Sequence, residues 1–248
     1  MINNFPILNL YKARNKSSEL VSQMIYGEKF QIIKNYGKWL KIKTNYDKYN
    51  GFIEKKNYKK ISKNTHKVFK LKSKIFFKKN SKFYFTNTFL PFNSKIEILN
   101  KKNSYIEFSK NKWINLKDIK NIKHKEKKFS KIYKIFLGTP YLWGGKSYKG
   151  IDCSALIQAF FQYNDLFCPR DSKDQITFFK SSREKNYLGK DYLIFWKGHV
   201  ASTLNNKSLI HAFGPKKKVL IMNTKKTISD IKKKSNLKIT GIRKLNAF

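Results

Sequence analysis

The chain has 248 residues, of which 40% are hydrophobic and 16% are aromatic. This content is enough to build folded cores, so composition excludes a disordered chain. The formal net charge of +40 has two readings, a polyanionic partner or compositional drift toward lysine. Basic residues exceed acidic ones throughout, by 32 to 8 in residues 1–128 and by 23 to 7 in residues 129–248. Because the charge is spread and Arg, the usual reader of base edges, is rare, we favour drift and expect no specific nucleic-acid partner.

Cysteine usage and the apolar runs give expectations about the compartment. Cys153 and Cys168 could pair, but two cysteines do not make a disulfide framework. The first residues lack a charged segment followed by a sufficient apolar run, which is the pattern of a signal peptide. No stretch of 18 apolar residues is present, so we expect no membrane span. The expectation is a reduced, cytoplasmic monomer, with export by a non-standard route left open.

Residues 1–62 contain short apolar runs separated by turns. Phe30–Ile33 and Trp39–Lys43 flank the turn Asn35–Lys38, and Gly51–Ile53 follows a polar turn. Several short strands at this spacing predict a small barrel or sandwich.

Residues 63–122 repeat this theme, and residues 123–128 are polar and basic, as expected of a linker. The candidate strands of the repeat are Lys74–Phe77, Phe83–Phe85, Lys95–Leu99, Tyr105–Phe108 and Lys112–Ile114. An internal duplication is therefore plausible. Each barrel could bind a ligand or could simply position the rest of the chain, and the sequence leaves both readings open.

Residues 129–248 read as helices followed by a meander of strands, which predicts an α+β domain. Apolar periodicity indicates a helix over Lys131–Leu137, a second helix that begins near Cys153, and a third over Ser172–Phe179 capped by Ser172. The later elements are the strands Tyr192–Trp196, Val200–Thr203, Leu209–Ala212 and Val219–Met222, a short helix over Ile228–Lys234 and a last strand over Lys238–Ile242.

The stretch Gly138–Phe161 carries the strongest chemical signal. A turn rich in glycine and aromatic residues runs into an acid, a cysteine and a serine, and an apolar helical face follows at once. Cys153 therefore falls in the first helical turn, where partial positive charge and unpaired N–H groups stabilise a thiolate. Cys153 is a candidate nucleophile. The alternative is a small buried thiol that merely packs, which is the commoner fate of a lone cysteine.

A thiol nucleophile needs a base, and the base needs an orienting group. His66 and His124 lie in lysine-rich surroundings and are expected at the surface. His199 and His211 belong to consecutive candidate strands, and an antiparallel turn at Asn205-Asn206 could bring them together. The alternative is one half-buried strand histidine and one loop histidine. One cysteine and two histidines are too few for a closed zinc site, so we expect no metal and no cofactor.

Four segments, in this order, resemble the NlpC/P60 family of papain-like cysteine peptidases. They read P-Y-L-W-G-G-K-S-Y-K-G-I-D-C-S-A-L-I-Q, C-P-R-D-S-K-D-Q, D-Y-L-I-F-W-K-G-H-V and L-I-H-A. The likeness covers residues 129–248, and the two predicted barrels resemble bacterial SH3-like (SH3b) domains. The resemblance implies an α+β papain-like catalytic domain preceded by two small all-β SH3-like barrels, as in γ-D-glutamyl-L-diamino acid endopeptidases.

The resemblance also implies an activity and its residues. The activity is hydrolysis of the γ-D-glutamyl–diamino acid bond of peptidoglycan-derived peptides that carry a free N-terminal L-Ala. By resemblance Cys153 is the nucleophile, His199 the general base and His211 the residue that orients it, while Tyr141 serves the oxyanion or lines the groove. The residues implied in substrate binding are Asp152, which would meet the substrate amine, with Ser154, Asp171 and Ser172, and Glu19 and Tyr49 of the first barrel.

A second reading belongs to a different class. The chain could be an SH3b-mediated binding protein for cell wall or anionic polymer, with weak or no hydrolase activity. Intact Cys153, His199 and His211 argue against a degenerate enzyme.

Overall fold

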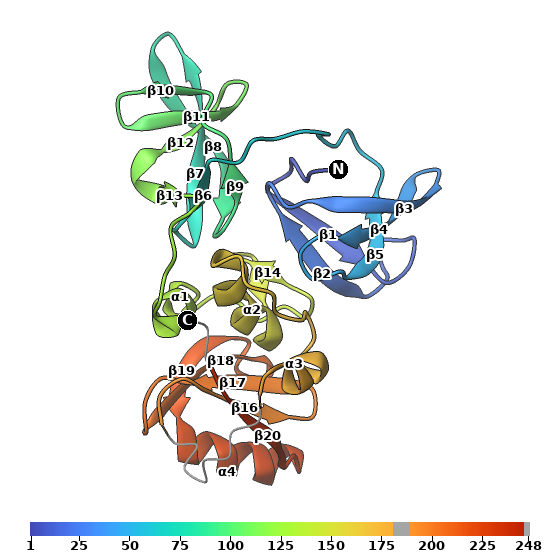
Figure 1. The fold of residues 1–248 in the computed structure, drawn as a ribbon, viewed down its shortest axis with the longest axis vertical. Coiled ribbons are helices and arrows are strands. Elements are labelled where there is room, and N and C mark those ends of the chain that lie inside the picture. The colour runs from blue at the N-terminus through green and yellow to red at the C-terminus, as the bar shows by residue number, and fades with distance from the viewer. Residues whose placement is uncertain (181–188, 246–248) are drawn as a thin grey trace. The chain divides into compact units, whose positions relative to one another are not determined.

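The computed structural model describes residues 1–180 and 189–245 and is drawn in Figure 1. The chain forms two compact units, Met1–His124 and Lys125–Phe248. The boundary falls inside the segment 123–128 that was expected to be a linker. The finer division of residues 1–122 into two separate domains stays a prediction.

A five-stranded antiparallel sheet begins the first unit, in the order β2-β1-β5-β4-β3. Its strands are β1 Ile7–Tyr11, β2 Leu20–Ile25, β3 Phe30–Tyr36, β4 Trp39–Thr44 and β5 Asn50–Glu54. The predicted strands of this region are confirmed as β3, β4 and β5. Buried and half-buried side chains alternate along β4, as a strand with one face on a core requires. That core includes Leu8, Leu10, Met24, Phe30 and Ile42.

Two further antiparallel sheets complete the first unit, ordered β10-β11-β12-β7-β8 and β13-β6-β9. Their strands are β6 His66–Val68, β7 Lys72–Lys79, β8 Lys82–Pro91, β9 Lys95–Ile96, β10 Asn100–Lys102, β11 Tyr105–Ser109, β12 Lys112–Asn115 and β13 Ile119–Asn121, with a 3-10 helix at Leu116–Asp118. The strand predicted over Lys95–Leu99 is shortened to β9. The chain leaves one sheet after Ile96 and enters the other at Asn100, so the segment between them cannot belong to a single ladder.

Tyr26, which follows β2, joins the core formed by the later strands of the first unit. Its ring meets Phe108 edge-on at 5.4 Å between centroids. The next residue, Gly27, has a φ of +84°, and a Cβ there would lie 2.0 Å from the Lys95 carbonyl oxygen. Only glycine fits this close approach of two backbone segments.

The second unit is α+β, as predicted. Its helices are α1 Phe129–Ile135, α2 Cys153–Tyr163, α3 Ser172–Phe178 and α4 Thr224–Ser235, with a 3-10 helix at Gly214–Lys216. Two short strands, β14 Lys146–Ser147 and β15 Gly150–Ile151, precede α2, and the main antiparallel sheet has the order β19-β18-β17-β16-β20. Its strands are β16 Tyr192–Trp196, β17 His199–Thr203, β18 Ser208–Phe213, β19 Lys218–Asn223 and β20 Ile239–Lys244.

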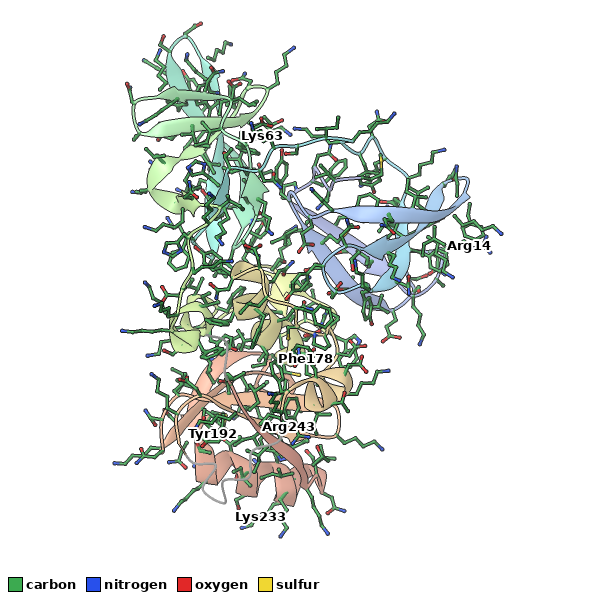
Figure 2. The ribbon with its side chains drawn as sticks, viewed as in Figure 1. Arg14, Lys63, Phe178, Tyr192, Lys233 and Arg243 are labelled. Carbon is green, nitrogen blue, oxygen red and sulfur yellow. The ribbon has the colours of Figure 1, made fainter. Side chains whose placement is uncertain are left out.

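The main sheet lies between helices. Helix α2 contacts β17 and β18, and α4 packs Ile231 against a cluster that includes Ile194 and Trp196 of β16. Figure 1 shows α2 and α4 on opposite sides of the sheet. Arg243 of β20, labelled in Figure 2, donates its Nε–H to the Ile176 carbonyl at 2.7 Å and so holds α3 to the sheet edge.

Three helices differ at their boundaries from the sequence expectation, and the first of them, α1, spans Phe129–Ile135 in place of the predicted Lys131–Leu137. Asp171, not Ser172, is the N-cap of α3, and no side-chain capping bond is made there. Helix α4 begins four residues before the predicted Ile228, because Asn223 caps it by accepting from the Lys226 N–H at 3.0 Å. An Asn with this bond is a strong helix start, and the apolar pattern alone does not reveal it.

Candidate active site

Cys153 is the first residue of α2, as predicted, and Asp152 is the N-cap. The Cys153 side chain is buried. Its sulfur interacts with the backbone N–H groups of Ser154, in its own helix, and of Val200, at the start of β17. The Val200 contact places the thiol directly beside the strand that carries His199. The fold therefore joins two segments that lie 46 positions apart in the chain.

The acidity of the Cys153 thiol is opposite to the sequence expectation. Burial first, and the Asp152 carboxylate second, raise its pKa to about 12, although the two N–H contacts and the Arg170 charge act to lower it. A desolvated thiolate is costly, and here that cost exceeds the favourable field of the helix start. At neutral pH the free site therefore holds a neutral thiol, which needs a base to become a nucleophile.

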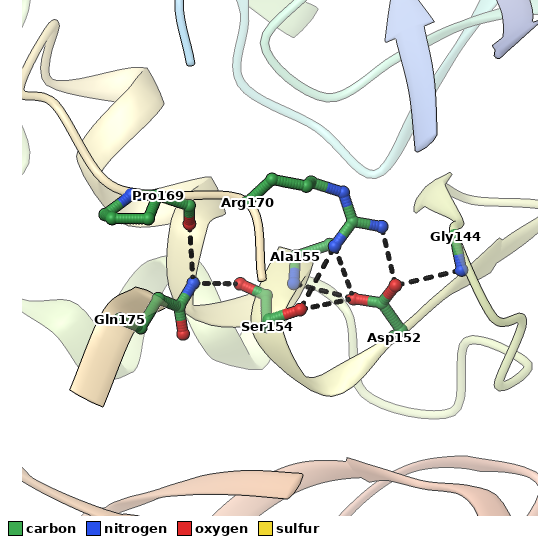
Figure 3. A network of polar contacts seen from close by, with 7 residues as sticks. All are labelled: Gly144, Asp152, Ser154, Ala155, Pro169, Arg170 and Gln175. Atoms are coloured by element: carbon green, nitrogen blue, oxygen red, sulfur yellow. Dashed lines mark hydrogen bonds and ion pairs between the residues drawn. The ribbon is translucent and has the colours of Figure 1, made fainter. Parts of the chain in front are cut away.

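A buried ion pair fixes the turn that bears Cys153 (Figure 3). Arg170 donates to both Asp152 oxygens, at 3.0 Å from Nη1 to Oδ1 and 2.6 Å from Nη2 to Oδ2. Asp152 also accepts the N–H of Gly144 at 2.9 Å and that of Ala155 at 2.8 Å. Ser154 donates to Asp152 at 3.1 Å and accepts from Arg170 at 3.0 Å. Asp152 and Arg170 are 5% and 3% exposed, so the pair is withdrawn from water and firmly placed.

These bonds bear on the predicted contact between Asp152 and a substrate amine. A carboxylate offers about four lone-pair sites, and five donors already point at Asp152. An incoming amine would have to share an oxygen with one of them. The structure thus shows Asp152 holding the turn, while its role toward substrate stays a prediction.

Arg170 received no role from the sequence. Arg170 lies in the segment C-P-R-D-S, where a positive charge beside Asp171 could have indicated an ion pair. Only the fold shows that its partner is Asp152. Gln175 of α3 steadies the same loop, since its Nε2 donates to the carbonyls of Ser154 and Pro169 at 2.9 Å each (Figure 3). The loop that carries Arg170 is therefore tied to both α2 and α3.

His199 and His211 lie together, as the predicted hairpin requires. The β17–β18 ladder pairs Ser202 with Ile210 and Thr203 with Leu209, so the two histidines share one face of the sheet. His199 Nε2 is 3.0 Å from His211 Nδ1. This contact occupies Nε2 of His199 and leaves its Nδ1 outside the histidine pair.

Both imidazoles are held neutral by their surroundings. Burial lowers the pKa of His199 to about 4. The pKa of His211, which is fully buried, is lowered well below its usual value by burial first and by the neighbouring His199 second. The ring of His211 also stacks on Phe213, with centroids 4.5 Å apart and planes 12° from parallel. The site therefore holds two neutral imidazoles in contact on β17 and β18, while the Cys153 thiol meets the Val200 N–H of β17.

Tyr141 lies within electrostatic reach of the nucleophile. Burial, and after it the charges of Cys153 and Asp152, raise its pKa above the ordinary value. Its backbone forms an isolated bridge with Ile151, directly before the Cys153 turn. The Tyr141 hydroxyl stays protonated at neutral pH and is able to donate a hydrogen bond near the thiol.

The remaining predicted site residues are described by their local contacts. Asp171 and Ser172 are half-buried at the start of α3. Glu19, in the first unit, is exposed and pairs with Lys12 at 3.0 Å. Tyr49 lies in the turn before β5, where its N–H donates to Thr44 Oγ1 at 2.9 Å. The substrate-binding roles of these four residues stay predictions.

Both cysteines lie within the described residues, 1–180 and 189–245. No disulfide joins Cys153 and Cys168, so the pairing that the sequence allowed is not formed. No group of three or more His, Cys, Asp or Glu in this part of the chain could hold a metal ion. None of the helices described combines the length and apolar character that crossing a membrane requires.

Comparison with known families agrees with the fold. Residues 138–235 match the NlpC/P60 family, and residues 10–57 match the bacterial dipeptidyl-peptidase Sh3 domain. The chain therefore carries a domain of the NlpC/P60 peptidase family, preceded by a bacterial SH3 domain in a strand-rich region of antiparallel sheets.

Individual relatives extend this finding. The γ-D-glutamyl-L-lysine dipeptidyl-peptidase of Bacillus subtilis is 34% identical over 100 residues, which are 38% of this chain and 34% of that protein. Dipeptidyl-peptidase 6 of Lysinibacillus sphaericus is 36% identical over 77 residues, 31% of this chain and 28% of that protein. The chain thus spans about a third of the length of these curated relatives.

A solved structure shows the same fold over nearly the whole chain. An NlpC/P60 family protein from Bacillus cereus superposes with a TM-score of 0.80, covers 98% of both chains and is 19% identical. At this identity the likeness concerns the fold alone. It supports the α+β fold of the second unit with an SH3-like, strand-rich region before it.

Proposed function

We propose that the protein is a cysteine peptidase that hydrolyses the γ-D-glutamyl–diamino acid bond of peptidoglycan-derived peptides with a free N-terminal L-Ala. The observation that carries the proposal is the arrangement of Cys153 at the start of α2, beside the strand whose His199 pairs with His211. The names of the relatives from two Bacillus species, both γ-D-glutamyl-L-lysine dipeptidyl-peptidases, support the substrate class.

The first chemical step forms a thioester. His199 Nδ1 accepts the thiol proton of Cys153 as the sulfur attacks the γ-carbonyl carbon of D-Glu. Negative charge then develops on the carbonyl oxygen. Backbone N–H groups at the start of α2 and the Tyr141 hydroxyl stabilise it, each donor contributing about 3 kcal/mol to the transition state. The imidazolium of His199 returns its proton to the departing amine of the diamino acid, and the C–N bond breaks.

The second step releases the product. Water attacks the thioester carbon while His199 accepts one of its protons, and the Cys153 sulfur leaves and regains a proton from the imidazolium. The free acid of L-Ala-γ-D-Glu departs. Because the resting thiol pKa is raised to about 12 and that of His199 is lowered to about 4, proton transfer accompanies attack and no charged pair is stored beforehand.

The test is mass spectrometry of the tripeptides L-Ala-γ-D-Glu-L-Lys and L-Ala-γ-D-Glu-diaminopimelate after incubation with the full chain. We expect release of the free diamino acid from at least one of them, and loss of more than about a thousandfold in rate for Cys153→Ala. Cys168→Ser, at the other buried thiol, is the matched control and retains hydrolysis. Full activity in Cys153→Ala would refute the proposal.

The preference for a free amine has its own test. The N-acetylated tripeptides differ only in the amine, so slower hydrolysis of these substrates supports recognition of a charged N-terminus. Equal rates for the free and acetylated peptides would remove that part of the proposal and leave the peptidase assignment standing.

A binding function has one observation in its favour. In the first unit a surface groove is lined by Arg14, Tyr36 and Trp39 among others, with the Arg14 guanidinium 4.6 Å from the centre of the Tyr36 ring. Aromatic and cationic groups of this kind suit a glycan or an anionic polymer. The full-length variant Cys153→Ala should then bind insoluble peptidoglycan. The double variant Cys153→Ala/Trp39→Ala should bind it less and stay in solution. Binding without hydrolysis by the wild type would favour this function over the peptidase.

A further inference from the structure

Three neighbouring strands place one side chain each in a row that leads away from the nucleophile. His199 of β17 meets His211 of β18, and His211 Nε2 lies 3.3 Å from the sulfur of Met222 on β19. The β18–β19 ladder pairs Leu209 with Met222 and His211 with Leu220, so Met222 and His211 are diagonal neighbours on one face. Met222 is half-buried and packs against the core cluster that includes Leu209.

The proton positions in this row are linked. When His199 takes the thiol proton on Nδ1, it carries a proton on both nitrogens. Its Nε2–H must then be donated to His211, so Nδ1 of His211 must be an acceptor. A neutral imidazole has one N–H, and the proton of His211 therefore has to sit on Nε2.

The other tautomer of His211 would disable the site. With its proton on Nδ1, His211 would donate to His199 Nε2 and leave the His199 proton on Nδ1, facing the thiol. His199 could then accept nothing from Cys153. The choice between the two tautomers depends on what the far nitrogen of His211 meets.

That far nitrogen is in a fully buried ring, because His211 is 0% exposed. An N–H buried without an acceptor is costly, so the required tautomer is stable only if an acceptor stands at Nε2. The thioether of Met222 is at hydrogen-bond distance for sulfur and is an acceptor without any proton to donate. It can therefore accept from Nε2–H and cannot stabilise the other tautomer by donating to a bare nitrogen.

We propose that Met222 is a positioning residue whose sulfur accepts the Nε2–H of His211 and thereby holds His211 in the tautomer that orients His199. This inference rests on the proposed peptidase function for its catalytic consequence, although the tautomer itself exists independently of turnover.

The direct test is nuclear magnetic resonance of the full chain with 15N-labelled histidine at pH 7.5. We expect His211 to carry its proton on Nε2 in the wild type. In Met222→Leu, which keeps the volume and removes the acceptor, the Nδ1–H tautomer should gain population. A wild-type His211 protonated on Nδ1, or an unchanged tautomer in Met222→Leu, would overturn the proposal whether or not the protein hydrolyses any peptide.

The kinetic test uses the tripeptide that the wild type cleaves. Met222→Leu should lower kcat about three- to tenfold, the worth of one ordinary hydrogen bond, with KM unchanged and with a shifted pH profile. Ile221→Leu, at the adjacent and outward-facing position of β19, is the control and keeps the wild-type profile.

The outcomes separate the two proposals. If no tripeptide is cleaved by the wild type, the peptidase proposal fails while the tautomer measurement still decides the role of Met222. If the wild type is active and Met222→Leu keeps its kcat and pH profile, the role of Met222 is refuted and the peptidase assignment stands.

Discussion

The two sides of the candidate site are held by different forces. On the helix side, the buried pair of Asp152 and Arg170 ties the turn of Cys153 with charge-assisted hydrogen bonds, the shortest of them 2.6 Å. On the sheet side, His199, His211 and Met222 form a row of neutral groups. The helix side therefore contains two opposite charges that neutralise each other, and the sheet side contains no charged group before the reaction begins.

This difference separates positioning from proton transfer. A buried ion pair with charge-assisted hydrogen bonds on both partners holds its residues in place, so it can fix the position of Cys153. The neutral imidazoles are free to accept and return a proton during attack. Breaking the helix side should therefore cost stability first, and altering the sheet side should change the pH dependence first.

The largest expected effect follows from breaking the ion pair. Arg170→Met removes the partner of a buried carboxylate and should lower the free energy of unfolding of the second unit by about 3–5 kcal/mol. Urea unfolding monitored by a probe in the second unit measures it. In the double variant Arg170→Met/Asp152→Asn the stranded charge is gone, so part of the loss should return. A double variant no more stable than Arg170→Met would contradict the ion-pair explanation.

The second largest effect is expected from acid, which should lower the free energy of unfolding through the buried histidines of the sheet side. The folded pKa of His199 is lowered to about 4, below its unfolded value near 6.5, so between these values the unfolded state binds more protons. Stability is fully present above about pH 6.5 and is lost as the pH falls toward 4, by up to about 3 kcal/mol from this residue. The lowered pKa of His211 acts in the same direction.

The measurement is the free energy of unfolding in urea at several pH values from 7.5 to 4.5. His199→Asn lacks the titrating group and serves as the control, so its stability should fall less steeply over this range. Parallel curves for the two proteins would show that His199 is not held neutral by burial.

A smaller effect should appear in the reactivity of the thiol. The Asp152 carboxylate contributes to the raised pKa of Cys153, and the Arg170 charge opposes it. Asp152→Asn should therefore lower that pKa and still cap α2, while it costs stability by leaving the buried Arg170 charge without its partner. A decrease of about one pKa unit corresponds to a tenfold gain in thiolate at a given pH. The rate of alkylation by iodoacetamide between pH 7 and 9 reports it, with Cys168→Ser as the background so that only Cys153 reacts. A slower reaction in Asp152→Asn would show that the carboxylate does not oppose ionisation.

The smallest effect on stability is expected at the surface of the first unit. Glu19 pairs with Lys12, and both side chains are largely exposed, so Glu19→Gln should change the free energy of unfolding by less than about 0.5 kcal/mol. A loss of tripeptide hydrolysis without such a change would support the substrate-binding role predicted for Glu19. A stability loss as large as that of Arg170→Met would contradict the expectation that this exposed ion pair contributes less to stability than the buried one.

Much of the site could be predicted from local patterns. The helical periodicity after Cys153 indicated its place at a helix start, and the spacing of His199 and His211 about a two-Asn turn indicated their meeting in a hairpin. Both depend on contacts close along the chain, where side-chain period and turn position decide the geometry. The strand predicted over Lys95–Leu99 is only partly confirmed, as β9, because the chain passes from one sheet to another within it.

Arg170 and Met222 could not be assigned in that way. Each acts through a contact that depends on how separate elements pack, the loop before α3 against the Cys153 turn and β19 against β18. A local run of residues such as C-P-R-D-S or V-L-I-M does not predict which distant residue will contact one of its members.

The sequence by itself determined the α+β class of the second unit, the helix that begins at Cys153 and the chemical types of the reacting groups. Only the tertiary structure decided the electrostatics. Helix position alone favours a thiolate at Cys153, whereas its burial in the fold, beside Asp152, raises the pKa to about 12. The reason is that desolvation depends on everything packed around an atom, while a local pattern specifies only the nearest neighbours along the chain.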